Sequence, residues 1–305
     1  MLVWGWCYMV YRRDIFLITV IVVFSLLLIA AAILNFYLWQ YQMFMPFYVT
    51  YLFFLAIIFY GVGLYSHNEQ LRSLRSVKWL GLFVLVALFH YISPGIIITT
   101  PFHAHDADLY RVGKWLGYDH VAVFNYLVDH PFANLCLDVI YNSLDLLMLI
   151  VPLLLIINGQ ERNLYRFCAY LMMTFLIGSV IYYCYPSIGV AAVLPELNFP
   201  SLDKQLVYQF NFIHEYRHFT GFVVPVISMP SFHTIWAMLI AFIARSYPRI
   251  KYWGLLYGLL VTASALLVGG HFVLDIVVGI VIAYIVWYIV EKNNAINASP
   301  KKAGL

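Results

Sequence analysis

Long apolar runs constrain this chain more than any other feature of its sequence. A helix needs about 20 mostly apolar residues to cross a bilayer, and about eight runs approach that length. Only 10% of the residues are charged and 64% are hydrophobic, which leaves too little charge to cover the surface of a soluble domain. The sequence therefore predicts an all-α integral membrane protein with about eight transmembrane helices. The expected spans are approximately 15–39, 44–66, 79–99, 134–157, 167–186, 231–247, 252–269 and 271–290.

The distribution of basic residues predicts the orientation of these spans. Cytoplasmic loops of membrane proteins carry an excess of lysine and arginine. With a cytoplasmic N-terminus, 13 of the 17 lysine and arginine residues fall on the cytoplasmic side. Both termini are then cytoplasmic, and two long connections, 100–133 and 187–230, are exoplasmic, facing a periplasm or a lumen. The basic residues that remain on the exoplasmic side are Arg111, Lys114, Lys204 and Arg217.

Three ionisable residues stand at the starts of two late spans. His233 belongs to "PSFH" at the start of the sixth span, and His271 and Asp275 belong to "GHFVLD" at the start of the eighth. The separation of 38 positions between the histidines fits one helix, a short turn and a helix back, so both histidines return to the exoplasmic face. His271 and Asp275 share a helical face at i, i+4. Ionisable groups in spans are costly and rare, so this group predicts a functional site.

The combination suits phosphoryl transfer. An imidazole whose far nitrogen is held by a carboxylate can act as a nucleophile or base, and a second histidine can give a proton to a leaving group. Other interpretations stay open from the residues alone. Two histidines and an aspartate can bind zinc, or form hydrogen bonds in a protein core. A proton-coupled transporter or a purely structural membrane protein are further alternatives.

The two motifs resemble the second and third signatures, P-S-G-H and S-R-x5-H-x3-D, of the type 2 phosphatidic acid phosphatase superfamily. Phe232 in place of the glycine, and the form "GGHFxxD", make the chain more similar to the inositol phosphorylceramide synthase branch. The resemblance implies that His271 is the nucleophile, that Asp275 orients it, and that His233 is the general acid. It implies no metal and no cofactor.

The resemblance covers the last six spans. It implies a six-helix catalytic core at 79–290, preceded by a two-helix extension at 1–78 and followed by a cytoplasmic tail at 291–305. The implied enzyme is an inositolphosphotransferase-like protein that moves a phosphoryl headgroup between lipids at the outer leaflet through a phosphohistidine. The alternative is a lipid phosphate phosphatase with the same first half-reaction. The expected partners are lipid substrates in the membrane; a net charge of +3 gives no reason to expect nucleic acid, and the oligomeric state is not predicted.

The residues that would bind phosphate depart from the family pattern. Ser264 and Ala265 stand where the phosphatases have Ser-Arg, and the first signature, K-x6-R-P, is absent. A phosphoryl group still needs positive charge and hydrogen-bond donors. Arg217 is the exoplasmic basic residue nearest in sequence to "PSFH", so it is the predicted phosphate ligand, with a solvated loop arginine as the alternative.

Three further residues are predicted to contribute to the substrate site. Ser231 lies at the start of the sixth span, next to the motif histidine. Asp138, near the outer end of the fourth span, could hold hydroxyls of a polyol headgroup, or could form hydrogen bonds between helices. Tyr185, at the end of the fifth span, could border the headgroup pocket, or belong to an interfacial aromatic belt.

The orientation can be tested by labelling introduced cysteines in intact cells. A cysteine at Asn198, in an exoplasmic connection, should react with a membrane-impermeant maleimide. A cysteine at Asn68, in a cytoplasmic connection, should react only after the cells are permeabilised. The opposite pattern would overturn the predicted orientation.

Overall fold

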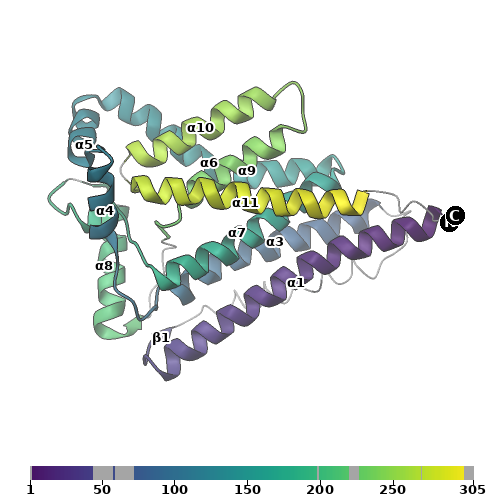
Figure 1. Cartoon of the computed structure of the whole chain (residues 1–305), viewed down its shortest axis with the longest axis horizontal. Helices are drawn as coiled ribbons and strands as arrows, with labels where there is room; N and C mark the ends of the chain where they lie inside the picture. Colours follow the sequence, from purple (N-terminus) through teal and green to yellow (C-terminus); the bar gives the residue numbers. More distant parts are fainter. Residues whose placement is uncertain are drawn as a thin grey trace.

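Helices form most of the described chain (Figure 1). The structure is a computed structural model that describes residues 2–43, 58, 72–197, 199–219, 227–268 and 270–298. The regular secondary structure of these residues is mainly α-helical, as predicted. The other elements are one 3-10 turn, η1 (Val190–Ala192), and two paired parallel strands of two residues each, β1 (Gln42–Met43) and β2 (His218–Phe219). The helices are α1 (Leu2–Tyr37), α3 (Arg72–Ile97), α4 (Asp106–Trp115), α5 (His120–Asp129), α6 (Pro131–Ile157), α7 (Glu161–Cys184), α8 (Ser201–Tyr216), α9 (Phe232–Ala244), α10 (Lys251–Leu267) and α11 (Val273–Ala298).

Five of the described helices are long and apolar enough to cross a membrane. Their apolar segments are Ile15–Tyr37, Val77–Ile97, Pro131–Ile157, Glu161–Cys184 and Val273–Asn293. This confirms the membrane-protein prediction without establishing eight spans. The expected span 44–66 lies largely outside the described residues, as do the labelling positions Asn68 and Asn198.

The expected sixth and seventh spans are shorter helices. α9 has 13 residues and α10 has 17. At 1.5 Å per residue α9 is about 20 Å long, less than the roughly 30 Å of a hydrocarbon core. α9 begins only after Ser231, whose hydroxyl accepts a hydrogen bond from the N–H of Thr234. The first residues of the predicted span therefore serve as a helix cap.

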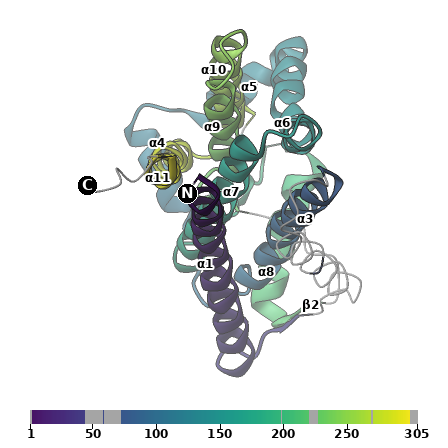
Figure 2. The ribbon, with the colours of Figure 1, turned by 90° about the vertical axis from the view of Figure 1, so that its right-hand side faces the viewer.

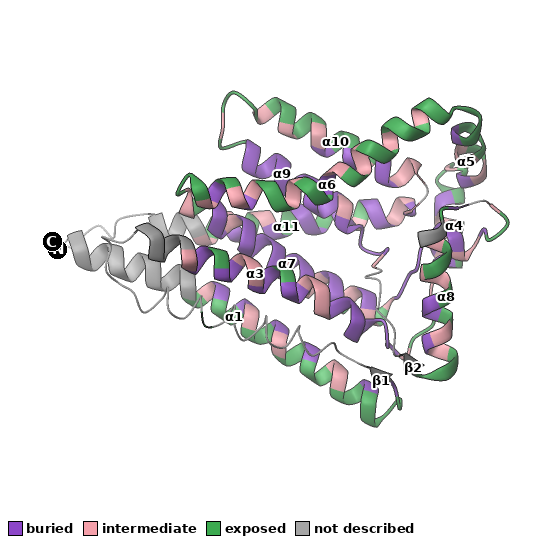
Figure 3. Cartoon of the chain, turned by 180° about the vertical axis from the view of Figure 1, so that it is seen from behind, coloured by how far each residue is buried: buried purple, intermediate pink, exposed green. Residues whose placement is uncertain are grey.

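α7 occupies the middle of the helical bundle. It packs against α1, α3, α6, α9 and α11, and the view along the bundle places it between them (Figure 2). Most of its residues are buried, whereas exposed residues line the outer helices α1, α6 and α10 (Figure 3). Many of those exposed side chains are large and apolar, for example Leu26, Leu135 and Leu259. Such a surface is suited to contact with lipid rather than water.

Three short helices gather at one end of the bundle. α4 and α5 form within the expected connection 100–133, and α8 forms within 187–230. They lie at the end where α11 begins, while α1 begins and α11 ends at the opposite end (Figure 1). The expected domain boundary at residue 78 falls within α3. The histidine-bearing helix starts therefore face a layer of helical connections.

Small residues allow α9 and α10 to approach closely. In α10 the glycines of the sequence "GLLYG" are Gly254 and Gly258, four positions apart. A Cβ atom on Gly258 would lie 3.1 Å from the carbonyl oxygen of Ala237 and 3.3 Å from the Cβ of Ala241. A Cβ on Gly254 would overlap the Cβ of Ala244. This is the small-residue packing that replaces the hydrophobic effect between helices in lipid.

Replacing Gly258 by valine should force α9 and α10 apart. Overpacking of this kind costs about 1–3 kcal/mol, so the thermal midpoint of Gly258→Val in detergent should fall clearly below that of the wild type. Leu255→Ala is the matched control, because this side chain is 48% exposed on the same helix. Equal midpoints for Gly258→Val and the wild type would show that the two helices do not need this close contact.

Candidate active site

Asp275 connects the start of α11 to the start of α9. Its carboxylate Oδ2 accepts a hydrogen bond of 2.8 Å from the backbone N–H of Phe272, as the third residue of a capping box does. Its backbone carbonyl accepts a bond of 3.1 Å from the N–H of Ser231, the cap of α9. The side chain of Asp275 is fully buried. These contacts hold the two helix starts side by side.

His271 lies just before α11, with its Nδ1 directed at protein acceptors. Nδ1 is 3.0 Å from the carbonyl oxygen of Ser228 and 3.6 Å from Oδ2 of Asp275. The carbonyl can only accept, so Nδ1 carries the hydrogen that it donates. The neutral ring then has its lone pair on Nε2, the nitrogen that a nucleophile needs.

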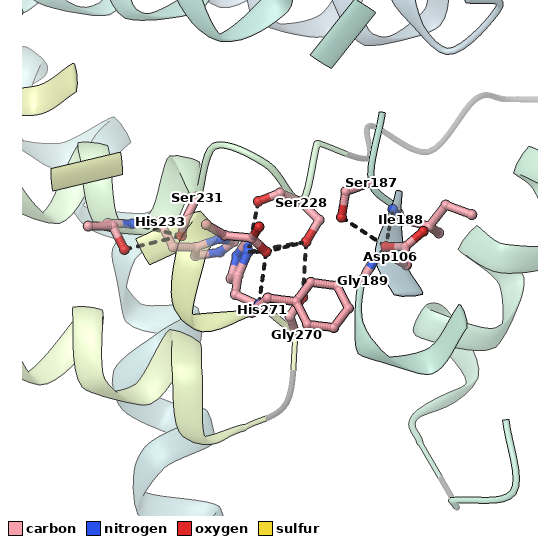
Figure 4. A network of polar contacts seen from close by, with 12 residues as sticks. Asp106, Ser187, Ile188, Gly189, Ser228, Ser231, His233, Gly270 and His271 are labelled. Carbon is pink, nitrogen blue, oxygen red and sulfur yellow. Dashed lines mark hydrogen bonds and ion pairs between the residues drawn. The ribbon is translucent and has the colours of Figure 1, made fainter. Parts of the chain in front are cut away.

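Ser228 links the backbone around His271 to the carboxylate of Asp275. Its hydroxyl donates to Oδ2 of Asp275 at 2.9 Å and lies 3.5 Å from Nδ1 of His271. Its carbonyl is the closer acceptor for His271, so the histidine is oriented by Ser228 and Asp275 together (Figure 4). Asp275 was predicted to orient His271, and the structure adds Ser228 as a further contact.

His233 lies in the first turn of α9, opposite His271. The two ring centroids are 5.7 Å apart, with the ring planes inclined by 60°. Tyr141 of α6 stacks on His233 at 3.9 Å, and its hydroxyl oxygen is 3.1 Å from Nδ1 of His233. The partner at Nδ1 and the stacked ring fix the orientation of the imidazole and leave Nε2 for another contact.

Phe232 fills space against the central helix. Its side chain is 6% exposed and packs at 5.4 Å from the ring of Phe175. On α7 the facing residue is Gly178, where a Cβ atom would lie 2.5 Å from the ring carbon Cζ of Phe232. The aromatic residue of "PSFH" thus anchors the start of α9 to α7.

Asp106, at the start of α4, binds a backbone loop beside this group (Figure 4). Its Oδ1 accepts hydrogen bonds from the hydroxyl of Ser187 at 2.8 Å and from the N–H groups of Ile188 and Gly189, both at 2.9 Å. Burial raises the pKa of Asp106 to about 6, although these hydrogen bonds act to lower it. The backbone of Ser187 in turn accepts a bond of 3.3 Å from the N–H of Ser228.

The structure brings His233, His271 and Asp275 together, and Ser231 joins them through its backbone N–H, which donates to the carbonyl of Asp275. Ser231 is fully buried, and its hydroxyl contacts Thr234 within α9. The other residues predicted to bind substrate contact different partners. Tyr185, the C-cap of α7, stacks on His105 at 3.9 Å.

Asp138 is exposed on α6, one turn before Tyr141. Arg217 ends α8 near the β1–β2 pairing, where its guanidinium donates to the carbonyl of Trp39 at 3.2 Å. The phosphate-binding role of Arg217 stays a prediction.

No group of three or more histidine, cysteine, aspartate or glutamate residues within the described ranges has a geometry that could hold a metal ion. The zinc interpretation therefore gains no support from these side chains.

Three polar residues of the site were not predicted: Tyr141, Ser228 and Asp106. Ser228 stands two positions before the proline of "PSFH", and Tyr141 stands within the polar stripe of α6 that includes Asp138. The sequence shows where these two residues stand, but it does not show which residues they contact. Asp106 contacts a loop 81 to 83 positions later in the chain.

Comparison with known proteins identifies one family. A family model described as "PAP2 superfamily" matches residues 107–289, which include the starts of α9 and α11. No curated protein and no solved structure matches the chain.

Tyr141→Phe should lower turnover of a lipid phosphate by about 10- to 100-fold, because the ring stays but the contact that orients His233 is lost. The thermal midpoint should change little. Tyr257→Phe is the matched control, since its hydroxyl contacts Ser143 of the same helix α6 at 2.9 Å. Unchanged turnover in Tyr141→Phe would contradict a role for Tyr141 in orienting His233.

Proposed function

We propose that this protein transfers a phosphoryl headgroup between membrane lipids. It belongs to the PAP2 superfamily, whose family model covers more than half of its 305 residues. Members of this superfamily are typically phosphatases or phosphotransferases. The proposal places the reaction at the outer leaflet, with both termini cytoplasmic. The excess of basic residues on the cytoplasmic side supports that orientation.

In the first half-reaction Nε2 of His271 attacks the phosphorus of the donor lipid. A P–N bond forms while the bond from phosphorus to the oxygen of the leaving lipid breaks. His233 gives a proton to that oxygen, so the leaving group departs as a neutral alcohol. Asp275 and Ser228 stabilise the positive charge that develops on the ring of His271.

In the second half-reaction the hydroxyl of an acceptor lipid attacks the phosphohistidine. The P–N bond breaks, and the acceptor proton passes to His233, which is then ready for another cycle. Water in place of the lipid alcohol would make the same protein a lipid phosphate phosphatase. We favour an alcohol acceptor because "PSFH" and "GHFVLD" resemble the inositol phosphorylceramide synthase branch.

The observation that carries the proposal is the pairing of His233 and His271 at 5.7 Å, each held at Nδ1 by a protein group. This leaves an Nε2 on each ring for the reacting phosphoryl group. Hydrogen bonding within a core would not require two imidazoles with both outward nitrogens available. Backbone N–H groups at the starts of α9 and α11 can add to the binding of an anion.

We assign substrate binding to four residues as part of the proposal. Arg217 would bind phosphate oxygens, and Asp138 would accept hydrogen bonds from hydroxyls of a polyol headgroup. Ser231 would contribute indirectly, because it caps α9 and so fixes the helix start that bears His233. Tyr185 would border the headgroup from the end of α7.

The proposal is tested with purified protein in detergent, a phospholipid donor labelled with ³²P, a long-chain alcohol acceptor, and EDTA. The wild type should form a new labelled lipid and an acid-labile, base-stable phosphohistidine. His271→Ala should lose both, with a turnover at least about 1000-fold lower, because the nucleophile is gone. His130→Ala is the control, since this histidine is exposed at the start of α6.

Each outcome separates two interpretations. Release of a water-soluble phosphorylated headgroup in place of a new lipid would show that water resolves the phosphohistidine, and would contradict the proposed alcohol acceptor. Loss of turnover in EDTA with recovery on adding zinc would identify a metal site and contradict the phosphohistidine. Full activity of His271→Ala would exclude the whole mechanism.

A further inference from the structure

We propose that Asp106 is a positioning residue for the His271–Asp275 pair, acting through the loop 187–189 and Ser228. This inference rests on the proposed function, because positioning is defined by the reaction that His271 performs. Asp106 lies on α4, outside the motifs that carry the family resemblance. Its role is inferred in three steps from the contacts that connect it to His271 and Asp275.

The first step is the contact between Asp106 and the loop. One carboxylate oxygen accepts three hydrogen bonds of 2.8–2.9 Å, from the hydroxyl of Ser187 and from two successive backbone N–H groups. Asp106 is only 4% exposed. Three donors converging on one buried oxygen restrict the loop in all directions, and a charged acceptor strengthens each bond.

In the second step, the loop that Asp106 holds contacts the backbone immediately before His271. Gly189 has φ of +126°, a conformation that favours glycine. A Cβ atom there would lie 3.0 Å from the carbonyl oxygen of Gly270, the residue that precedes His271. The loop held by Asp106 therefore packs directly on the backbone that bears the nucleophile.

The third step runs through Ser228. Its N–H donates to the carbonyl of Ser187 at 3.3 Å, so the residue that contacts Asp106 also fixes Ser228. Ser228 then provides the carbonyl acceptor for His271 and the hydroxyl donor for Asp275. Figure 4 shows Ser228 between His271 on one side and the Asp106 loop on the other.

The cost of burying Asp106 argues against a purely incidental contact. Its second oxygen, Oδ2, is buried with no hydrogen-bond partner among the described residues. Burial of an ionisable group that is only partly satisfied is unfavourable, so an amide, which keeps an accepting oxygen without the charge, would be the less costly choice for stability alone. Such a group is more readily explained by function than by folding.

The inference is tested by separating the number of active sites from the quality of each site. Sites are counted by the ³²P label on His271, turnover is expressed per labelled site, and orthovanadate serves as a mimic of the five-coordinate phosphoryl group. Asp106→Ala should lower kcat per site by about 10- to 100-fold and raise the Ki of vanadate by a similar factor. The KM for the donor lipid should stay within about threefold of the wild type, because contacts to the lipid remain.

Two variants serve as comparisons. Asp106→Asn keeps an oxygen that accepts the three bonds, so its kcat per site should recover to within about fivefold of the wild type. Asp108→Asn removes the same charge two positions later on α4, where the side chain is 45% exposed and contacts Arg111 and His105. Its kcat per site and vanadate Ki should match those of the wild type.

A loss of labelled sites with normal kcat per site and normal vanadate Ki would show that Asp106 only supports the fold, and would overturn the inference. If Asp106→Ala does not fold, Gly189→Ala tests the same inference, because Gly189 lies in the loop that Asp106 holds and contacts Gly270. Its Cβ would displace Gly270, so vanadate Ki should rise; an unchanged Ki would overturn the inference. Absence of label and turnover in the wild type would instead contradict the proposed function.

Discussion

The positions of the two histidines depend on Asp275, which binds one helix start through its backbone and the other through its side chain. The backbone carbonyl of Asp275 binds the cap of α9, and its carboxylate binds the backbone at the start of α11. One residue thereby sets the relative position of two helix starts, and with them His233 and His271. In a site of low polarity a buried carboxylate is tolerated only with such partners. Ser228 is a further partner of this carboxylate, and its backbone N–H binds the loop that Asp106 of α4 holds.

The pairing of the two histidines was predictable from the sequence for a simple geometrical reason. Two apolar helices joined by a short turn bring residues 38 positions apart back to one level, and the structure places the two rings 5.7 Å apart. The helical class was likewise predictable from the lengths of the apolar runs. These features depend on local periodicity and chain connectivity, which a single sequence displays.

The supporting contacts could not be predicted, because they join residues with no periodic relation. Tyr141 meets His233 across 92 positions, and Asp106 meets its loop across more than 80. Each depends on how α6 or α4 packs against the bundle. The short helices α4 and α8 were also not predicted, since they stand in polar connections. α9 is short mainly at its C-terminal end, since it stops at Ala244, three residues before the end of the predicted span, while Ser231 is its cap.

The contact between Phe232 and Gly178 has a consequence for substitutions at both positions. A side chain on α7 at position 178 and a phenyl ring at position 232 cannot occupy the space together, because a Cβ would stand 2.5 Å from the ring. With a glycine at position 232, the space that the ring fills would be open to a larger residue at position 178. The two positions are therefore energetically coupled, so the effect of changing both residues should differ from the sum of the two single changes.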